Sequence, residues 1–437
     1  MKIKNTLLTA LLISFVLIAS FPARATKNAQ RPARQRAPIM GADFIFADWP
    51  HPLIEGLRDS RKSKAMSRAF SAAGLASLRF SFSGFYSPRG ERTTESLKAE
   101  NKKTNQFPWF PIDDYIDYIA GHDFTTVLGI NVEEGADVAY QTVDDFLRRT
   151  SRRKLVAVEL SNEPHLNHRP WQPEDYAERA ADIIESLSRL RVKFAVPLTV
   201  GNESNTPTKL SDNEWNRRML AALSKRIALK NRSDIYGVLH LYARGVSSDT
   251  VDAFNKAVRP FAPQMRYLVT EFNIRSSLKG NPHLTDEYAL EFARKVAEIM
   301  SRPEIEAVYV HAVPYHAILY WSDGRRVATV NGHRDPRLTN EERAEGWHLT
   351  PAGRVYNLYS TLAWNGEVLF FQGGGQSHWA VRDDRGRIVL TLLNTEGGAA
   401  RKNVKIEGRQ YRLTAPARSI VCFDQTGREI ARVTFER

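Results

Sequence analysis

A chain of 437 residues is longer than one ordinary core needs, and it matches the size of one enzyme barrel with a modest accessory domain. Hydrophobic residues make up 42% and charged residues 25%, a balance that excludes a disordered or fibrous protein. The formal net charge of +13 favours encounters with anionic polymers, but it equally suits a solvated surface that keeps the protein in solution. Nucleic acid is not expected as a partner, because the basic residues are dispersed and no recognition motif accompanies them.

The N-terminus has the pattern of a secretory signal peptide over residues 1–25. A short basic stretch is followed by an apolar run over residues 7–21, and Ala23 and Ala25 supply the small residues that a signal peptidase prefers. The apolar run is short for a membrane span, although an uncleaved anchor is the alternative. We expect a mature chain that begins near Thr26, has no stable membrane span and is periplasmic or secreted.

The next segment, residues 26–40, carries Pro and Arg without apolar periodicity and is predicted to be a flexible leader. After it, short apolar runs rich in β-branched or aromatic residues alternate with amphipathic stretches, as in a parallel sheet with crossover helices. Eight such runs predict an α/β fold, a (β/α)8 TIM barrel over residues 41–362. The runs are 43–48, 77–82, 124–130, 154–160, 194–200, 235–241, 266–271 and 306–313.

The pattern changes after a helix-like stretch over residues 351–362. From Val368 onward the runs are short and strand-like, and glycine-rich turn signals separate them. Residues 363–437 are therefore predicted to form a C-terminal all-β sandwich domain, completed by strands from residues 26–42. Cys422, the only cysteine, lies in one of these runs, where a small buried apolar residue is a better interpretation than a catalytic thiol.

Two of the predicted barrel strands lead into a carboxylate, Glu163 after the fourth and Glu271 at the end of the seventh. The carboxyl ends of all barrel strands open on the same face, so these side chains can converge on one ligand despite their distance in sequence. A glycosidic bond needs an acid for the bridging oxygen and a carboxylate for the positive anomeric carbon. A structural ion pair is the alternative interpretation of either glutamate.

The Asn162-Glu163-Pro164 motif after the fourth strand, with Glu271 ending the seventh, resembles the retaining glycoside hydrolases of clan A. The likeness extends over residues 43–320 as an ordered series. The segment Val269-Thr270-Glu271-Phe272-Asn273 is most similar to family 39, and families 30, 51 and 79 share the trailing β domain. The resemblance implies that Glu163 is the acid/base and Glu271 the nucleophile of a double displacement.

The same resemblance implies supporting roles for four further residues. Arg79 would bind the nucleophile, Asn162 would bind the sugar 2-hydroxyl, and one of His240 and Tyr242, which lie two apart on one strand and face the same way, would contact Glu271. The alternative for Arg79 is a pair with Glu159, which faces the same side of its strand as Glu163 and would otherwise be an unpaired charge inside the barrel; this pairing is compatible with a role at the nucleophile. The alternative for His240 is a hydrogen-bonded core histidine.

Aromatic residues near the strand ends are candidates for stacking on sugar rings. Trp321, after the eighth strand, is the best of them, and the alternative is that its side chain packs in the hydrophobic core. Weaker candidates are Trp49, Trp109, Trp171 and Tyr315. His311 and His316 lie near the same rim, and the sequence assigns them no role.

Other chemistries lack their motifs, since the chain has no HExxH, no Cys/His zinc set, no phosphate-binding P-loop and no GxSxG elbow. We therefore expect no cofactor and no metal. The leading hypothesis is a retaining O-glycosyl hydrolase that cleaves a poly- or oligosaccharide, with an anionic polysaccharide as one possible partner. A non-catalytic carbohydrate-binding protein on the same barrel and a transglycosylase are the alternatives.

Overall fold

A computed structural model describes residues 35–44, 56–80, 112–165, 171–199, 210–242, 248–274, 282–313, 318–325, 339–341 and 344–436. The predicted signal peptide and most of the predicted leader lie outside these residues. Among the helices of the described ranges, none combines the length and the apolar character that a membrane crossing requires.

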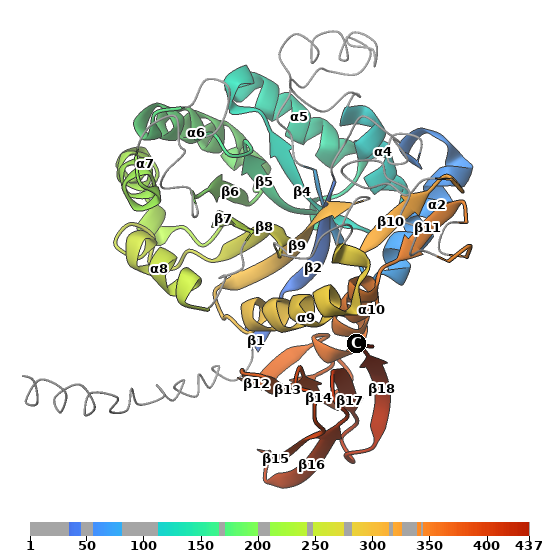
Figure 1. The fold of residues 1–437 in the computed structure, drawn as a ribbon. Helices are drawn as coiled ribbons and strands as arrows, with labels where there is room; N and C mark the ends of the chain where they lie inside the picture. Colours follow the sequence, from blue (N-terminus) through green and yellow to red (C-terminus); the bar gives the residue numbers. More distant parts are fainter. Residues whose placement is uncertain are drawn as a thin grey trace, which may run out of the picture.

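Eight parallel strands close into a barrel (Figure 1). Each strand pairs with its neighbours in chain order, and the first, β2, also pairs with the last, β9, which closes the ring. This confirms the predicted (β/α)8 fold. The strands are β2 (Ile39–Phe44), β3 (Ser77–Phe80), β4 (Thr125–Ile130), β5 (Leu155–Leu160), β6 (Phe194–Pro197), β7 (Ile235–Tyr242), β8 (Tyr267–Asn273) and β9 (Ile305–Val313).

Helices surround the barrel and cover the outer faces of its strands (Figure 1). The α-helices are α2 (Ser60–Ala72), α4 (Ile112–Gly121), α5 (Gly135–Arg149), α6 (Pro173–Leu187), α7 (Asp212–Arg226), α8 (Ser248–Val258), α9 (Asp286–Met300) and α10 (Pro351–Leu358). Short 3-10 turns are η1 (Val132–Glu134), η2 (Arg152–Lys154), η3 (Ser188–Leu190), η4 (Leu229–Asn231) and η5 (Pro282–Leu284), and a π-helical turn, η6 (Tyr359–Ala363), follows α10.

Helix α6 shows how the local sequence sets one of these elements. Proline at its first position needs no hydrogen-bond donor there, and Glu174 and Asp175 place negative charge at the positive end of the helix dipole. The buried positions Tyr176, Ala180 and Ile183 recur at helical spacing, so one face packs on the barrel.

Two separate apolar layers follow from the alternation of side chains along the barrel strands. The interior cluster contains Tyr236, Val238, Leu268, Ala307 and Tyr309 with small residues of β4, β5 and β6. The alternate residues of the same strands join the larger cluster beneath the helices. The interior cluster therefore fills the barrel, as in other barrels of this kind, and leaves the carboxyl ends of the strands for polar side chains.

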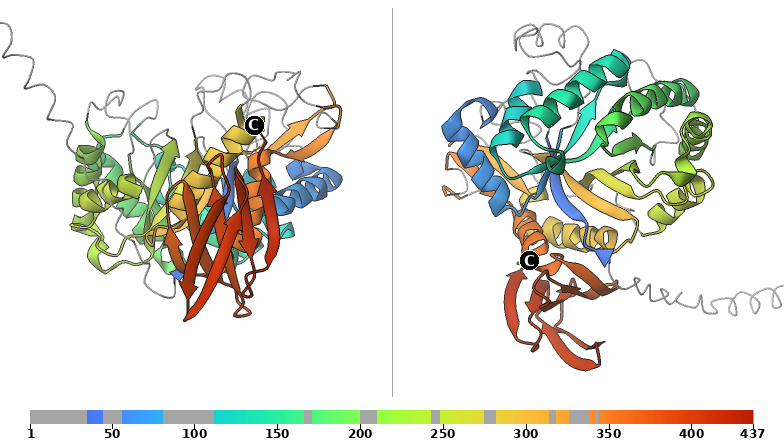
Figure 2. Two further views of the ribbon diagram at one scale, coloured as in Figure 1. Left: turned by 60° about the horizontal axis from the view of Figure 1, so that its bottom comes forward. Right: turned by 180° about the vertical axis from the view of Figure 1, so that it is seen from behind.

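The C-terminal β domain packs beside α9 and α10 (Figures 1 and 2). Its six-stranded antiparallel sheet has the order β1-β12-β13-β14-β17-β18, and the hairpin β15-β16 packs on that sheet around a core of its own. The strands are β1 (Gln35–Arg36), β12 (Glu367–Gln372), β13 (Gln376–Arg382), β14 (Ile388–Asn394), β15 (Ala400–Ile406), β16 (Arg409–Ala415), β17 (Ser419–Phe423) and β18 (Glu429–Thr434). Cys422 is buried in β17.

Polar contacts fix the β domain against the barrel. The indole of Trp379 donates to the carbonyl oxygen of Ala363 at the end of the π-helical turn, at 2.7 Å. Arg418 forms an ion pair of 3.2 Å with Glu287 at the start of α9. The two domains are therefore joined by α10, by the short β1 strand and by this interface.

The first barrel strand was predicted too late in the chain. The apolar run 43–48 suggested a strand there, whereas β2 spans Ile39–Phe44. Gln35–Arg36 pairs with β12, which agrees with the prediction that strands from residues 26–42 complete the β domain and shows that the leader predicted over residues 26–40 is too long. Gly41 explains why the sequence pattern misses the start of β2, since a strand glycine weakens the apolar pattern but is needed where another group approaches closely.

Gly41 gives a test of barrel packing. A Cβ atom added there would lie 2.5 Å from the ring of Tyr309 and 2.6 Å from the backbone oxygen of Ser77. We expect Gly41→Ala to lower the free energy of unfolding by about 1–3 kcal/mol in urea denaturation, because a buried ring and a strand must shift. Gly121→Ala is the control, because a Cβ there meets nothing within 4 Å. Equal stability of both variants would contradict this packing.

Candidate active site

Arg79 lies at the centre of the carboxyl ends of the barrel strands, with its side chain 0% exposed. Its Nε and Nη2 donate to the two oxygens of Glu159 at 2.8 and 2.6 Å, which is a bidentate pair. Its Nη1 donates to Oε1 of Glu271 at 2.7 Å and lies 3.3 Å from Oδ1 of Asp43. One guanidinium therefore connects carboxylates from β2, β5 and β8.

The loop after β5 presents Glu163 in an uncommon backbone conformation. Ser161 has φ of 74° and Glu163 has φ of 42°, a region that costs a residue other than glycine about 1 kcal/mol or more. Between them, Asn162 accepts from Nη2 of Arg79 at 2.7 Å through Oδ1, which leaves its Nδ2 for another acceptor. The Glu163 side chain is 30% exposed, so it faces the open end of the barrel.

A strand irregularity turns Glu271 toward Arg79. Leu268 belongs to the barrel interior, so strict alternation would place Thr270 inward and Glu271 outward. The pairing of β7 with β8 steps from Leu239↔Val269 to His240↔Glu271, which makes Thr270 the extra residue of a β-bulge. The bulge brings the Glu271 carboxylate into the site, where it is 8% exposed.

Four groups surround the carboxylate of Glu271. Arg79 binds Oε1, whereas the Tyr242 hydroxyl donates to Oε2, and Nδ1 of His240 and of His311 lie 3.5 and 3.6 Å from Oε2. Burial alone would raise the pKa of Glu271, but the positive charges of the two histidines and Arg79 outweigh it and hold that pKa well below its usual range. Glu271 is therefore kept ionised.

His240 contacts both candidate glutamates. Its Nδ1 forms a hydrogen bond of 2.9 Å with Oε1 of Glu163, and its Nε2 lies 3.1 Å from the hydroxyl of Thr270. Burial lowers the pKa of His240, but the charge of Glu271 and the bond to Glu163 more than offset this and raise it. His240 is therefore buried, as a core histidine would be. Its contacts, however, are with the two candidate glutamates of the site.

The two glutamates lie close together. A carboxylate oxygen of Glu163, one of Glu271 and a ring nitrogen of His240 all lie within 4.8 Å of one another. This is near the separation of about 5–5.5 Å typical of retaining glycosidases, and well below the roughly 6.5–9.5 Å typical of inverting ones.

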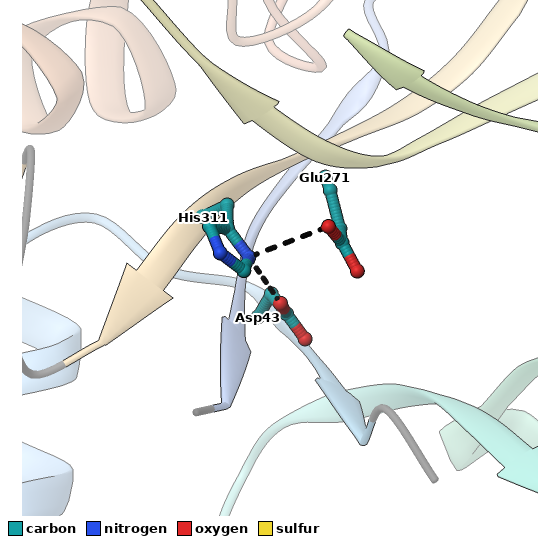
Figure 3. A group of neighbouring side chains, drawn as sticks. All are labelled: Asp43, Glu271 and His311. Carbon is teal, nitrogen blue, oxygen red and sulfur yellow. Dashed lines mark hydrogen bonds and ion pairs between the residues drawn. The ribbon is translucent and has the colours of Figure 1, made fainter. Parts of the chain in front are cut away.

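Sequence reasoning assigned no role to a second pair in the cluster. Asp43 on β2 and His311 on β9 form a hydrogen bond of 2.7 Å through Nδ1 of the histidine, next to Glu271 (Figure 3). The sequence places His311 near the rim of the barrel and assigns it no role. The signal that could have found Asp43 is an acidic residue in the first barrel strand, beside the last strand in the closed ring.

The structure gives less support to the aromatic candidates. Trp321 lies on β10 (Leu319–Ser322), which pairs with β11 (Gly346–Leu349), and its register partner is Trp347. Among the contacts of the described residues, none joins Trp321 to the cluster around Arg79, so its sugar-stacking role stays a prediction. Trp171 packs against the main core. Trp49, Trp109, Tyr315 and His316 lie outside the described residues.

Two groups of side chains have donor atoms spaced closely enough for a cation, Asp43 with Glu271 and His311, and Glu163 with His240 and Glu271. Glu271 belongs to both groups and is already bound by the buried guanidinium of Arg79. Because Arg79 already supplies positive charge to Glu271, the member common to both groups, we assign neither group as a metal site.

No protein-family model and no curated protein sequence matches the chain. Among solved structures, an endo-β-1,6-glucanase matches with a TM-score of 0.57 and 14% identity, over 91% of this chain and 94% of that chain. A family 39 β-xylosidase from Caulobacter crescentus matches with a TM-score of 0.53 and 14% identity, over 84% and 79%. A family 51 arabinofuranosidase from Xanthomonas axonopodis pv. citri matches with a TM-score of 0.54 and 13% identity, over 88% and 87%.

The fold is that of the clan A glycoside hydrolases. The predicted resemblance to this clan, with family 39 and related families, is therefore confirmed. At this level of identity the likeness concerns the fold, and the chemistry must be argued from the site itself.

The buried charge of Arg79 gives a prediction about stability. We expect Arg79→Met to lower the free energy of unfolding by about 3–5 kcal/mol at neutral pH, because it leaves buried carboxylates without a counter-charge. The charge of Arg79 helps to lower the pKa of Glu271, so in the variant this carboxylate should take up a proton at a higher pH than in the wild type and so lose its unpaired charge. The deficit of the variant should therefore shrink between pH 7 and pH 4.

Urea unfolding of both proteins at the two pH values measures this deficit. Arg217→Met is the matched control, because Arg217 forms only an exposed pair with Glu214 and should contribute little. A deficit for Arg79→Met that stays constant from pH 7 to pH 4 would show that lost packing, not charge, is responsible.

Proposed function

We propose that the protein is a retaining glycoside hydrolase that cleaves O-glycosidic bonds of a poly- or oligosaccharide by double displacement. The observation that carries the proposal is the approach of Glu163 and Glu271, whose carboxylate oxygens lie within 4.8 Å at the open end of the barrel. At that spacing one carboxylate can reach the anomeric carbon directly, without a water molecule between them.

In the first step Glu271 attacks the anomeric carbon while Glu163, in its acid form, gives its proton to the bridging oxygen. The bond from carbon to the leaving oxygen breaks as the ester bond to Glu271 forms. The environment suits these roles, because Glu271 is buried and held ionised, whereas the more exposed Glu163 can reach the leaving group.

In the second step Glu163, now a carboxylate, takes a proton from water, whose oxygen bonds to the anomeric carbon as the ester to Glu271 breaks. The sugar leaves with its original configuration, and Glu163 is again an acid. Asn162 can assist both steps, since Arg79 holds its Oδ1 and so fixes the direction in which Nδ2 can donate to the sugar 2-hydroxyl.

An anionic polysaccharide is one substrate class with specific support. The outward positions of the hairpin β15-β16 include the exposed Arg401, Lys405 and Arg412, and their cross-strand partners on that face are Thr414, Gln410 and Asn403. This hairpin face thus combines positive charge with neutral hydrogen-bonding groups. Such a face would favour an acidic polymer over a neutral one by charge.

Mechanism-based labelling tests the proposed reaction. We expect a 2-fluoro glycoside of a cleaved sugar to modify Glu271, as shown by peptide mass spectrometry, and Glu271→Gln to abolish hydrolysis and labelling. Glu163→Gln should lower the rate on substrates with poor leaving groups by about 10²–10⁴-fold, with a smaller loss on activated aryl glycosides that need no acid.

The substrate for this test comes from a screen of aryl glycosides and of neutral, uronic-acid and sulfated polysaccharides. Glu174→Gln is the control, because Glu174 forms only a partly exposed ion pair with Arg218 on the outer helices. A chain that binds polysaccharide but shows no hydrolysis, no transfer to added sugar acceptors and no labelling would be a carbohydrate-binding protein instead.

We also propose that the chain is exported, because its first 25 residues have the pattern of a signal peptide. Expression of the full chain in a bacterial host should give a periplasmic or secreted protein whose N-terminal sequence begins at Thr26. Recovery of the intact N-terminus from the membrane fraction would show an uncleaved anchor.

A further inference from the structure

An ion pair that the two chemical steps do not use lies beside Glu271. Asp43 is 1% exposed and His311 is 20% exposed, and Nδ1 of the histidine lies 2.7 Å from Oδ2 of Asp43. The same Nδ1 lies 3.6 Å from Oε2 of Glu271. Figure 3 shows both contacts converging on this one ring nitrogen, with the other ring nitrogen directed away from the two carboxylates.

A break in the strand ladder coincides with this pair. Between β2 and β9 the register steps from Ala42↔Val310 to Phe44↔Val313, so Asp43 alone lies opposite His311 and Ala312. Such bulges change the direction of side chains and are over-represented beside active sites. The pair therefore occupies a specific local geometry at the point where the barrel closes.

The charges around His311 favour its protonated form. Asp43 and Glu271 contact it from β2 and β8, the ring of Tyr242 on β7 meets it edge-on at 5.2 Å, and Arg79 opposes it from β3. Burial lowers the pKa of His311, but the charges of Glu271 and Asp43 more than offset burial and Arg79 and raise it. His240, the other nearby titratable group, lies against the same Glu271 oxygen.

We propose that Asp43 and His311 form a positioning pair in which Asp43 holds His311 protonated and the charge of that histidine assists the departure of Glu271 from the glycosyl-enzyme. This inference rests on the proposed function. Glu271 is an anion before attack, a neutral ester in the intermediate and an anion again after hydrolysis. A cation 3.6 Å from Oε2 stabilises the anion more than the ester.

The pair thus acts in opposite directions on the two steps. It slows attack, which consumes the charge of Glu271, and it speeds hydrolysis of the intermediate, which restores that charge. The histidine keeps its proton throughout, while the proton of the attacking water goes to Glu163. Asp43 and His311 act through Glu271 and need not touch the sugar.

Steady-state kinetics on an activated aryl glycoside separate the two steps, because a good leaving group makes hydrolysis of the intermediate limit kcat, whereas kcat/KM reports attack. We expect His311→Gln to lower kcat about tenfold or more and to lower KM in parallel, with kcat/KM changed less than about threefold. The labelled intermediate should also last longer in this variant.

The pH profile provides a second readout. His311 has a raised pKa, so its charge is present at low pH and is lost as pH rises through that value. The alkaline limb of wild-type kcat should become smaller in His311→Gln, where only His240 can still titrate beside Glu271. In Asp43→Asn the limb should move to lower pH, because the carboxylate that raises the histidine pKa is gone.

His122→Gln is the matched control, since His122 precedes β4 at the opposite end of the barrel and bonds Ser63. It should leave kcat, KM and the profile unchanged. A fall of kcat/KM as large as that of kcat, or an alkaline limb that both Asp43→Asn and His311→Gln leave unchanged, would overturn the pair's role while Glu271 is still labelled. A wild-type chain with no labelling would overturn the proposed function itself, and the pair's role with it.

Discussion

The buried guanidinium of Arg79 is the interaction on which the site depends. Asp43, Glu159 and Glu271 come from three different strands, and without a cation between them their charges would repel one another in a region of little water. The planar fork of arginine can bind several oxygens at fixed angles, which a lysine could not do. The same group therefore allows the barrel to close over carboxylates and fixes where those carboxylates point.

Irregular strand pairing does the rest of the positioning. A regular parallel ladder alternates side chains strictly, and it would turn Glu271 away from the barrel axis. The bulge at Thr270 turns Glu271 inward, and the break beside Asp43 lies where His311 meets it. With the left-handed backbone at Ser161, these departures from ideal geometry gather at one end of the barrel, as strain commonly does at functional sites.

The sequence was sufficient for features that depend on local pattern. The eight runs predicted the barrel, and the position of Glu163 and Glu271 at strand ends predicted their convergence. The pairing of Arg79 with Glu159 was an alternative compatible with the same site, and the structure contains it. It was insufficient where tertiary contact decides. Ring closure alone brings Asp43 next to His311, because β2 and β9 lie at opposite ends of the barrel sequence. No residue pattern marks a bulge, and the start of β2 was obscured by its glycine.

The two oxygens of Glu271 are held by groups of different kind. Oε1 is bound by Arg79, whose charge is permanent and whose pKa is raised far above the range where it could titrate. Oε2 is bound by Tyr242 and flanked by His240 and His311, both of which can gain or lose a proton. A permanent charge suits a requirement of the fold, which must hold at every pH that the protein meets. In the proposed mechanism, the titratable charges make the stability of the departing Glu271 carboxylate, and so the hydrolysis of the ester, depend on pH.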